Sequence, residues 1–168
     1  MRDKELYGVR VYNVAQSFGI TMTSVREIID SFVSECRLTL KSGSVLRLGD
    51  LATIRPNIIK TEYVPTLGYL SKLVADKKGL PYYTVYSVVN EYLNTVKDDI
   101  LAGKNADIRK LVSFHSISLG FEQFKVNCVL SASVRNDLRS CDVPMSARVS
   151  FSKILRSMIK EGVDKDDW

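Results

Sequence analysis

The chain has few of the residues from which recognisable sites are built. Its 168 residues include one histidine, one tryptophan, four prolines and three cysteines. Cys36, Cys128 and Cys141 are odd in number, widely separated and without metal-ligand spacing, so they predict reduced thiols rather than a disulfide framework or a metal site. The single histidine, His115, has no acid and nucleophile at a recognisable spacing, which argues against a catalytic triad.

Further absences narrow the class of protein. No apolar run approaches the roughly 18 residues needed to span a bilayer, and the first six residues lack the apolar core of a signal peptide. The sequence contains no glycine-rich phosphate loop, no paired-carboxylate signature and no cofactor motif. These absences predict an intracellular, non-enzymatic protein with no metal, no cofactor, no small-molecule substrate and no membrane partner.

What the chain does have is an internal repeat at an offset of 60 residues. Its apolar positions share offsets of 0, 3, 4, 7, 8, 11 and 15 from the first one. They are Val25, Ile28, Ile29, Phe32, Val33, Cys36 and Leu40 in one copy, and Val85, Val88, Val89, Tyr92, Leu93, Val96 and Ile100 in the other. This spacing places every member on one face of a helix of about four turns. Gly43 and Gly103 follow as left-handed C-terminal caps.

A unit this small cannot bury its own apolar stripe, and two stripes of equal length can cover each other. The repeat therefore predicts a pseudo-symmetric pair of helices. Its expected core consists of Val25, Ile28, Ile29, Phe32, Val85, Val88, Val89 and Tyr92.

The first copy of the repeat predicts two helices followed by two short strands. A short amphipathic helix covers residues 11–18, and Thr23 or Ser24 caps the long helix. Residues 45–55 are typical of two short strands about a Gly-Asp turn, and Pro56 stops the pairing.

The second copy predicts the same helices and then a longer β region. Its short helix covers residues 68–78, and its long helix ends near Leu101. Residues 107–119 are partly alternating and typical of a strand. Division of the chain at this repeat predicts a helical unit over residues 1–60 and a second unit over residues 61–168.

The last third of the chain predicts a β-arm and a closing helix. Two alternating segments, 124–134 and 143–151, flank the polar and basic residues 135–142, so a two-stranded arm is expected over 124–151. Residues 152–160 are amphipathic and predict the closing helix.

Charge is concentrated in this last third. The whole chain has a net charge of +5, and residues 125–160 contain seven basic and two acidic residues, a balance that equals the whole net charge. The tail that follows, residues 161–168, is acidic and ends in Trp168, an aromatic that could dock in a neighbour.

Several of these segments resemble the HU/IHF family of bacterial histone-like proteins. The likeness lies in the helix, glycine turn and long helix, in Lys-x-Gly at 41–43, in Val-Leu-Arg-Leu-Gly-Asp-Leu-Ala-Thr-Ile at 45–54, and in Val-Pro-Met-Ser-Ala-Arg-Val-Ser-Phe-Ser-Lys-Ile-Leu at 143–155. Residues 68–161 resemble a whole subunit, and residues 9–57 resemble only its helical half and first strands. The resemblance implies an α+β fold of two fused units that interlock through their helices. It also implies β-arms that clasp DNA, with a proline at each tip that kinks it.

The sequence departs from that family where DNA would be bent. The first unit has no room for an arm, so one chain cannot form a two-armed clasp. At the expected tip of the second arm, Arg135 and Asn136 match the family, but Asp137 stands in place of the proline. An aspartate does not wedge between bases and is repelled by phosphate.

The leading hypothesis is therefore a structural protein that binds copies of itself and other structural proteins. Similar proteins of HU/IHF-like fold occur in the neck and tail rings of crAss-like phage virions, so this resemblance implies a virion component assembled in the host cytoplasm. The alternative is an architectural DNA-binding protein of the cytoplasm or nucleoid. For either partner, double-stranded DNA or protein, the expected contact residues are Arg135, Asn136, Arg139, Arg148, Lys153 and Arg156.

Two further nucleic-acid hypotheses are weaker. Ala15, Gly19 and Val25 have the spacing of a helix-turn-helix, but the stripe that follows is long enough to be better explained by a core. Tyrosines at the start of the second long helix could stack on bases, although such residues more often pack at a subunit edge. These tyrosines are Tyr82, Tyr83 and Tyr86.

Overall fold

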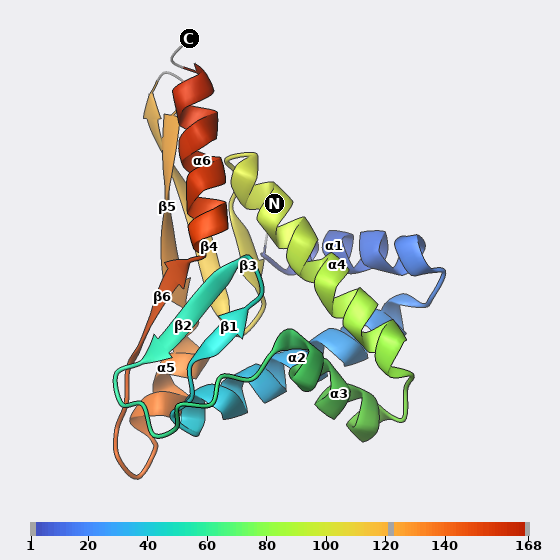
Figure 1. Ribbon diagram of the computed structural model, residues 1–168. Coiled ribbons are helices and arrows are strands. Elements are labelled where there is room, and N and C mark those ends of the chain that lie inside the picture. Colours follow the sequence, from blue (N-terminus) through green and yellow to red (C-terminus); the bar gives the residue numbers. More distant parts are fainter. Residues whose placement is uncertain (1–2, 121–122, 167–168) are drawn as a thin grey trace.

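The protein has an α+β fold (Figure 1). The computed structural model describes residues 3–120 and 123–166, which form six helices and two three-stranded antiparallel sheets. The helices are α1 (Asp3–Phe18), α2 (Met22–Lys41), α3 (Leu67–Lys78), α4 (Tyr82–Leu101), α5 (Ala132–Arg139) and α6 (Lys153–Asp166). The strands are β1 (Leu46–Leu48), β2 (Ala52–Pro56), β3 (Ala106–Ile108), β4 (Val112–Gly120), β5 (Gln123–Leu130) and β6 (Ala147–Phe151). Trp168 lies outside the described residues.

The internal repeat is reproduced in the backbone. The long helices α2 and α4 have the same length, and each end of α4 lies 60 residues after the matching end of α2. The offset continues into the strands, because β1 pairs with β2 in the same register as β3 pairs with β4: Leu46 lies opposite Ile54, and Ala106 lies opposite Phe114. The structural repeat is thus longer than the sequence match, which ends at Gly103.

The ends of the long helices agree with the sequence in one respect and differ in another. Gly43 and Gly103 have φ angles of 77° and 75°, the left-handed conformation that glycine adopts at least cost. The predicted cap of the first long helix at Thr23 or Ser24 is wrong. The side chain of Thr21 accepts a hydrogen bond from the Ser24 amide at 3.1 Å, so the helix begins one turn earlier than its apolar stripe.

The core surrounds the two long helices. The eight residues predicted for the paired core are each at most 1% exposed. The helices α2 and α4 contact each other, and α1 and α3 each pack against both of them. The inner faces of both sheets complete the same apolar cluster, in which Phe114 of one sheet and Phe151 of the other stack at 5.7 Å.

The predicted arm over residues 124–151 is wrong. Its first strand, β5, pairs with β4 instead, and the expected polar tip is the helix α5. Its second strand, β6, pairs with β2 of the first unit, with Phe151 opposite Ala52 and Arg148 opposite Arg55. The alternation of residues located both strands but does not identify their partners. The helix α5 was not predicted, because its buried face consists of only Val134 and Leu138 and gives little apolar periodicity.

These pairings nest one unit inside the other. Ser131 and Ser152 occupy matching places, because their amides donate to the Leu111 and Leu51 carbonyls at 2.9 and 3.2 Å, and their side chains cap α5 and α6. Residues 3–56 and 147–166 form one unit, and the second unit, residues 67–139, lies between these two segments in the sequence. The β2–β6 pairing therefore crosses the predicted boundary at residue 60.

The paired core predicts a large difference between two substitutions in α2. Phe32 is fully buried against α4, whereas Leu38 in the same helix is 53% exposed. We expect Phe32→Ala to lower the free energy of unfolding by about 3–5 kcal/mol, because it leaves a cavity at the centre of the helix pair. Leu38→Ala should change it by less than about 1 kcal/mol. Urea unfolding followed by circular dichroism measures both, and equal effects would contradict the paired core.

Candidate interaction surfaces

One β-hairpin extends beyond the rest of its sheet. The short strand β3 pairs only with residues 112–114 of β4, whereas β4 continues to Gly120 and stays paired with β5. The equivalent strand β2 ends at Pro56. Within the described part of the chain, one hairpin therefore protrudes, formed by β4 and β5 beside α6 (Figure 1).

The inner face of this hairpin is supported by α6. The helix contacts β5, and its Leu155 is fully buried. Val126 and Cys128 of β5 pack partly against the core. Burial raises the pKa of the Cys128 thiol to about 11, so this cysteine is a packing residue and not a reactive thiolate.

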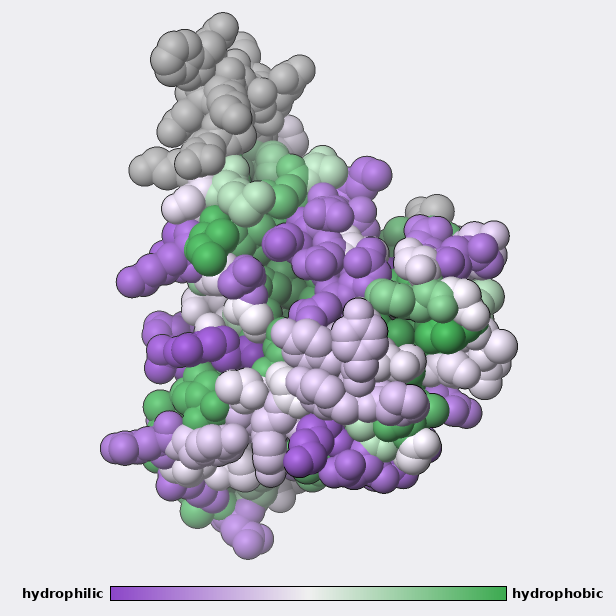
Figure 2. Space-filling view, turned by 45° about the vertical axis from the view of Figure 1, so that its right-hand side comes forward, coloured by the Kyte–Doolittle hydropathy of each residue, from purple (hydrophilic) through white to green (hydrophobic). Residues whose placement is uncertain are grey.

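The outer surface near the hairpin carries exposed apolar side chains. Ile117, Leu119 and Val129 are 38%, 56% and 42% exposed, and α6 adds Ile154 and Met158 at 57% and 40%. Figure 2 shows apolar side chains gathered near the upper end of the molecule, where Figure 1 places α6 and the hairpin. Exposed apolar side chains on a protruding element favour a protein contact.

The free edge of β4 is partly guarded. Beyond Phe114 it has no strand partner among the described residues. At Ser116 the side chain of Asn105 takes the place of a strand, accepting the Ser116 amide hydrogen at 2.9 Å, and the Ser116 hydroxyl donates to the Lys104 carbonyl at 3.2 Å. The edge beyond Ser116 is open to pairing with another chain.

The six predicted contact residues are exposed but lie on three separate elements. Arg135, Asn136 and Arg139 belong to α5, Arg148 to β6, and Lys153 and Arg156 to α6. Figure 1 places α5 at the lower end of the molecule and α6 at the upper end, so the six residues do not form one surface. The prediction that Arg135 and Arg139 lie at the tip of an arm is wrong. Within the described strands of the hairpin, Lys125 is the one lysine or arginine.

Asp137 has a structural role that the sequence did not reveal. Its carboxylate accepts a hydrogen bond from Arg37 of α2, and Lys41 lies 3.8 Å away. The hydrogen bond from Arg37 and the charges of Arg37 and Lys41 lower the pKa of Asp137. Asp137 thus attaches α5 to α2.

The remaining candidates lie on α2, α4 and β4. The helix α2 contacts α1, α3, α4 and α5, which identifies it as a core helix and not as a protruding recognition helix. Tyr82 stacks on Tyr86 at 5.8 Å along the first turns of α4. His115 is exposed on β4, opposite Asn127 of β5.

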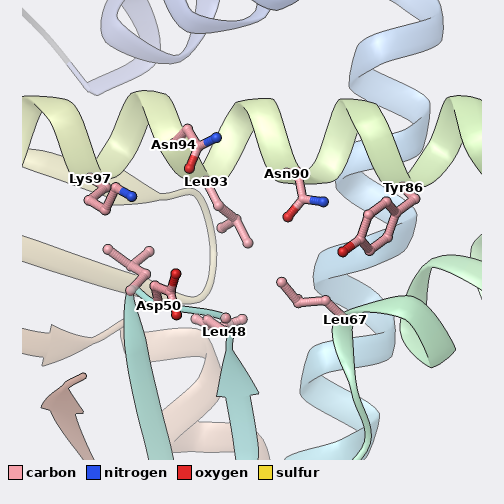
Figure 3. Close-up of a pocket in the computed structure, with 10 residues that line it drawn as sticks. Leu48, Asp50, Leu67, Tyr86, Asn90, Leu93, Asn94 and Lys97 are labelled. Atoms are coloured by element: carbon pink, nitrogen blue, oxygen red, sulfur yellow. The ribbon is translucent and has the colours of Figure 1, made fainter. Parts of the chain in front are cut away.

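A hollow of about 270 Å³ lies between α4 and the turn that joins β1 to β2 (Figure 3). Asn90, Asn94 and Lys97 project from α4 toward Asp50 and Leu67 on the other side. Its polar side chains are one carboxylate, one amine, two amides and the Tyr86 hydroxyl, so it has no pair of carboxylates for acid–base chemistry. In the described part of the chain, no group of three or more His, Cys, Asp or Glu residues is placed to hold a metal ion.

No protein-family model matches the sequence, and no curated protein matches it. Within residues 3–120 and 123–166, no helix is both long and apolar enough to cross a membrane.

The ion pair between α2 and α5 predicts a pH-dependent contribution to stability. The folded-state pKa of Asp137 is lowered, so the pair stabilises the fold above the pKa of an unfolded aspartate, about 3.9. That contribution disappears as the pH falls through the lower, folded-state pKa. We expect Asp137→Asn to lower the free energy of unfolding by about 0.5–1 kcal/mol at pH 7.

The difference between Asp137→Asn and the wild type should then shrink progressively below about pH 4. Asp142→Asn, which removes an exposed carboxylate just beyond α5, is the matched control. Urea unfolding at several pH values measures both variants. A difference that is the same at pH 3 and pH 7 would contradict the ion pair as its cause.

Proposed function

We propose that this chain is a non-enzymatic structural protein that acts through protein–protein contacts, as a subunit of a phage head–tail connector or tail ring. The observation that carries this proposal is the single β4–β5 hairpin. It extends past its sheet, is supported on its inner face by α6, and exposes Ile117, Leu119 and Val129 on the outside. Such an element suits a contact with a neighbouring subunit.

The proposal includes an HU/IHF-like fold for both units. Each unit has a first helix, a long helix, two antiparallel strands, a third strand and a closing helix, and in the second unit β4 and β5 are lengthened into the hairpin. The long helices of the two units pair in one core, as two interlocked subunits would. In this design one chain takes the place of a dimer, and it has one protruding hairpin, β4–β5, in place of two arms.

The hairpin engages a neighbour by two kinds of contact. The open edge of β4 beyond Ser116 presents backbone groups for strand addition, and alternate apolar side chains enter pockets of the partner. The hydrogen bond from Ser116 to Asn105 keeps the inner part of the edge occupied, so pairing is confined to the distal half.

An architectural DNA-binding role remains the alternative, and it has less support. Its six contact residues are divided among α5, β6 and α6, and the hairpin strands carry a single lysine, Lys125. DNA-bending proteins of the arm type need cations and an apolar wedge on the arm itself. A protein partner fits the apolar hairpin better.

Shortening the hairpin tests the proposal. Replacing residues 117–125 with Asn-Gly joins Ser116 to Val126, which already lie opposite each other, through a two-residue turn. The long helices and both three-stranded sheets remain. We expect the thermal midpoint to change little and the native mass to fall to small species, measured by mass photometry in physiological salt.

Two side-chain variants sharpen that experiment. Ile117→Ser with Leu119→Ser keeps the hairpin backbone and removes apolar contacts, and should also reduce the assembly. Tyr83→Ser, at a side chain 79% exposed on α4, is the control and should assemble as the wild type does. Unchanged assembly by the shortened protein would overturn the hairpin as connector.

A further inference from the structure

A cluster of arginines covers the outer face of the first sheet. Arg47 of β1, Arg55 of β2 and Arg148 of β6 are all exposed there, on the face opposite the buried Leu46, Leu48 and Ile54. Arg55 and Arg148 lie directly opposite each other in the ladder. We call these three residues the arginine face.

The arginine face carries unbalanced charge. None of the four ion pairs found among the described residues includes Arg47, Arg55 or Arg148. Like charges directly opposite each other across a ladder destabilise a sheet. The isolated fold therefore gains nothing from Arg55 and Arg148 as neighbours.

The second sheet shows that the scaffold does not require these arginines. The matching positions, set by the same strand registers, hold Asp107, His115 and Asn127 in place of Arg47, Arg55 and Arg148. Two sheets with one backbone design thus carry different chemistry on their outer faces. The shared backbone design therefore does not account for the three arginines.

A hollow of about 360 Å³ adjoins the arginine face where β2 ends and β6 begins. Arg55, Arg148 and Ile59 line it, and Ile59 is 52% exposed. Its wall is fixed by two hydrogen bonds of 2.8 Å: the Asn57 amide donates to the Ser146 carbonyl, and the Ser146 amide donates to the Asn57 side chain. The surface therefore offers two guanidinium groups beside an apolar patch.

The chain itself contains a segment of complementary chemistry. Residues 161–168 include four acidic residues and one lysine and end in tryptophan. Carboxylates form bidentate pairs with guanidinium groups, and an indole packs on apolar surface or on arginine. A phosphate backbone would satisfy the arginines but would leave Ile59 without a partner.

The described part of this segment belongs to α6, which runs away from the arginine face of its own chain. The helix α6 starts beside Leu51, where the Ser152 amide donates to the Leu51 carbonyl, and Arg55 lies toward the other end of β2. From there α6 extends over 14 residues, about 20 Å, toward the upper end of the molecule in Figure 1, away from Pro56. This path favours the tail of another copy as the partner.

We propose that the acidic C-terminal segment of one copy binds the arginine face of the next, with its carboxylates on Arg55 and Arg148 and Trp168 beside Ile59. Because the two surfaces differ, the contact is head-to-tail, the type that closes into rings or continues as filaments. The contact rests on the proposed function, since both need copies of this chain to associate. It differs from the hairpin contact in being ionic and therefore sensitive to salt.

The first experiment replaces the arginines with the residues found at the matching positions of the second sheet. In the wild type, raising the salt from 50 to 500 mM should lower the association constant by about tenfold or more, because salt screens the ionic contact. Arg55→His with Arg148→Asn should abolish this salt-sensitive part of self-association. Arg135→Ala with Arg139→Ala removes the same charge from α5 and should leave it unchanged. Removal of residues 161–168 should act as the first variant does. Sedimentation velocity measures all four proteins.

Charge reversal provides the decisive test. A protein with Arg55→Glu and Arg148→Glu, and another with Glu161→Lys and Asp164→Lys, should each fail to form the salt-sensitive contact alone. Mixing them should restore it, because each tail then meets a face of opposite charge. Failure of the mixture to associate, or salt-sensitive association by either protein alone, overturns the proposal.

Two controls distinguish this contact from hairpin pairing and from DNA binding. The shortened-hairpin protein should retain the salt-sensitive contact, so failure of the hairpin proposal and failure of this one are distinguishable. A 20-base-pair duplex is the DNA probe. If Arg55→His with Arg148→Asn lost duplex binding and kept self-association, the arginine face would be a nucleic-acid surface and the proposal would be wrong.

Discussion

The mutual burial of two equal apolar stripes is the constraint on which this structure depends. The seven apolar positions of α2 and the seven of α4 are all buried, and neither helix has enough partners within its own unit to achieve this. The helices α1 and α3 each pack on both long helices, so the two units cannot separate without exposing the core. The two halves of the repeat therefore fold as one body.

The nested chain path adds a second, long-range constraint. The strand β6 returns to β2 after the whole second unit has been inserted between them, and α6 then covers β5 of that second unit. Each closing helix begins at a capping serine, Ser131 or Ser152, just after a third strand. The second unit is inserted between β2 and β6, which is where a hairpin of the first unit would have to lie. The single hairpin thus follows from the way the two units are joined.

The sequence predicted those features that depend on local periodicity. The helices other than α5, the left-handed caps at Gly43 and Gly103, and most strand segments follow from apolar spacing and glycine placement, and the α+β class is confirmed. Strand partners were not predictable, because the alternation of residues 143–151 fits β2 as well as β5. The arginine face was missed for the same reason: Arg55 and Arg148 are far apart in the sequence and meet only through the β2–β6 register.

Matching positions that hold different residues in the two units show which residues the fold requires. In the core most of these positions keep an apolar residue, as with Phe32 and Tyr92, and Arg10 is an exception. Arg10, at the place of Leu70, is 5% exposed and pairs with Asp99 of α4 at 2.9 Å, beside the ring of Tyr92. A partly buried ion pair is weak evidence for stability, but it penalises any arrangement that leaves the buried Arg10 charge unpaired. The pair thereby favours the observed packing of α1 on α4. On the surface no such penalty operates, so the longer hairpin and the three arginines mark positions where the two units diverged without cost to the shared core.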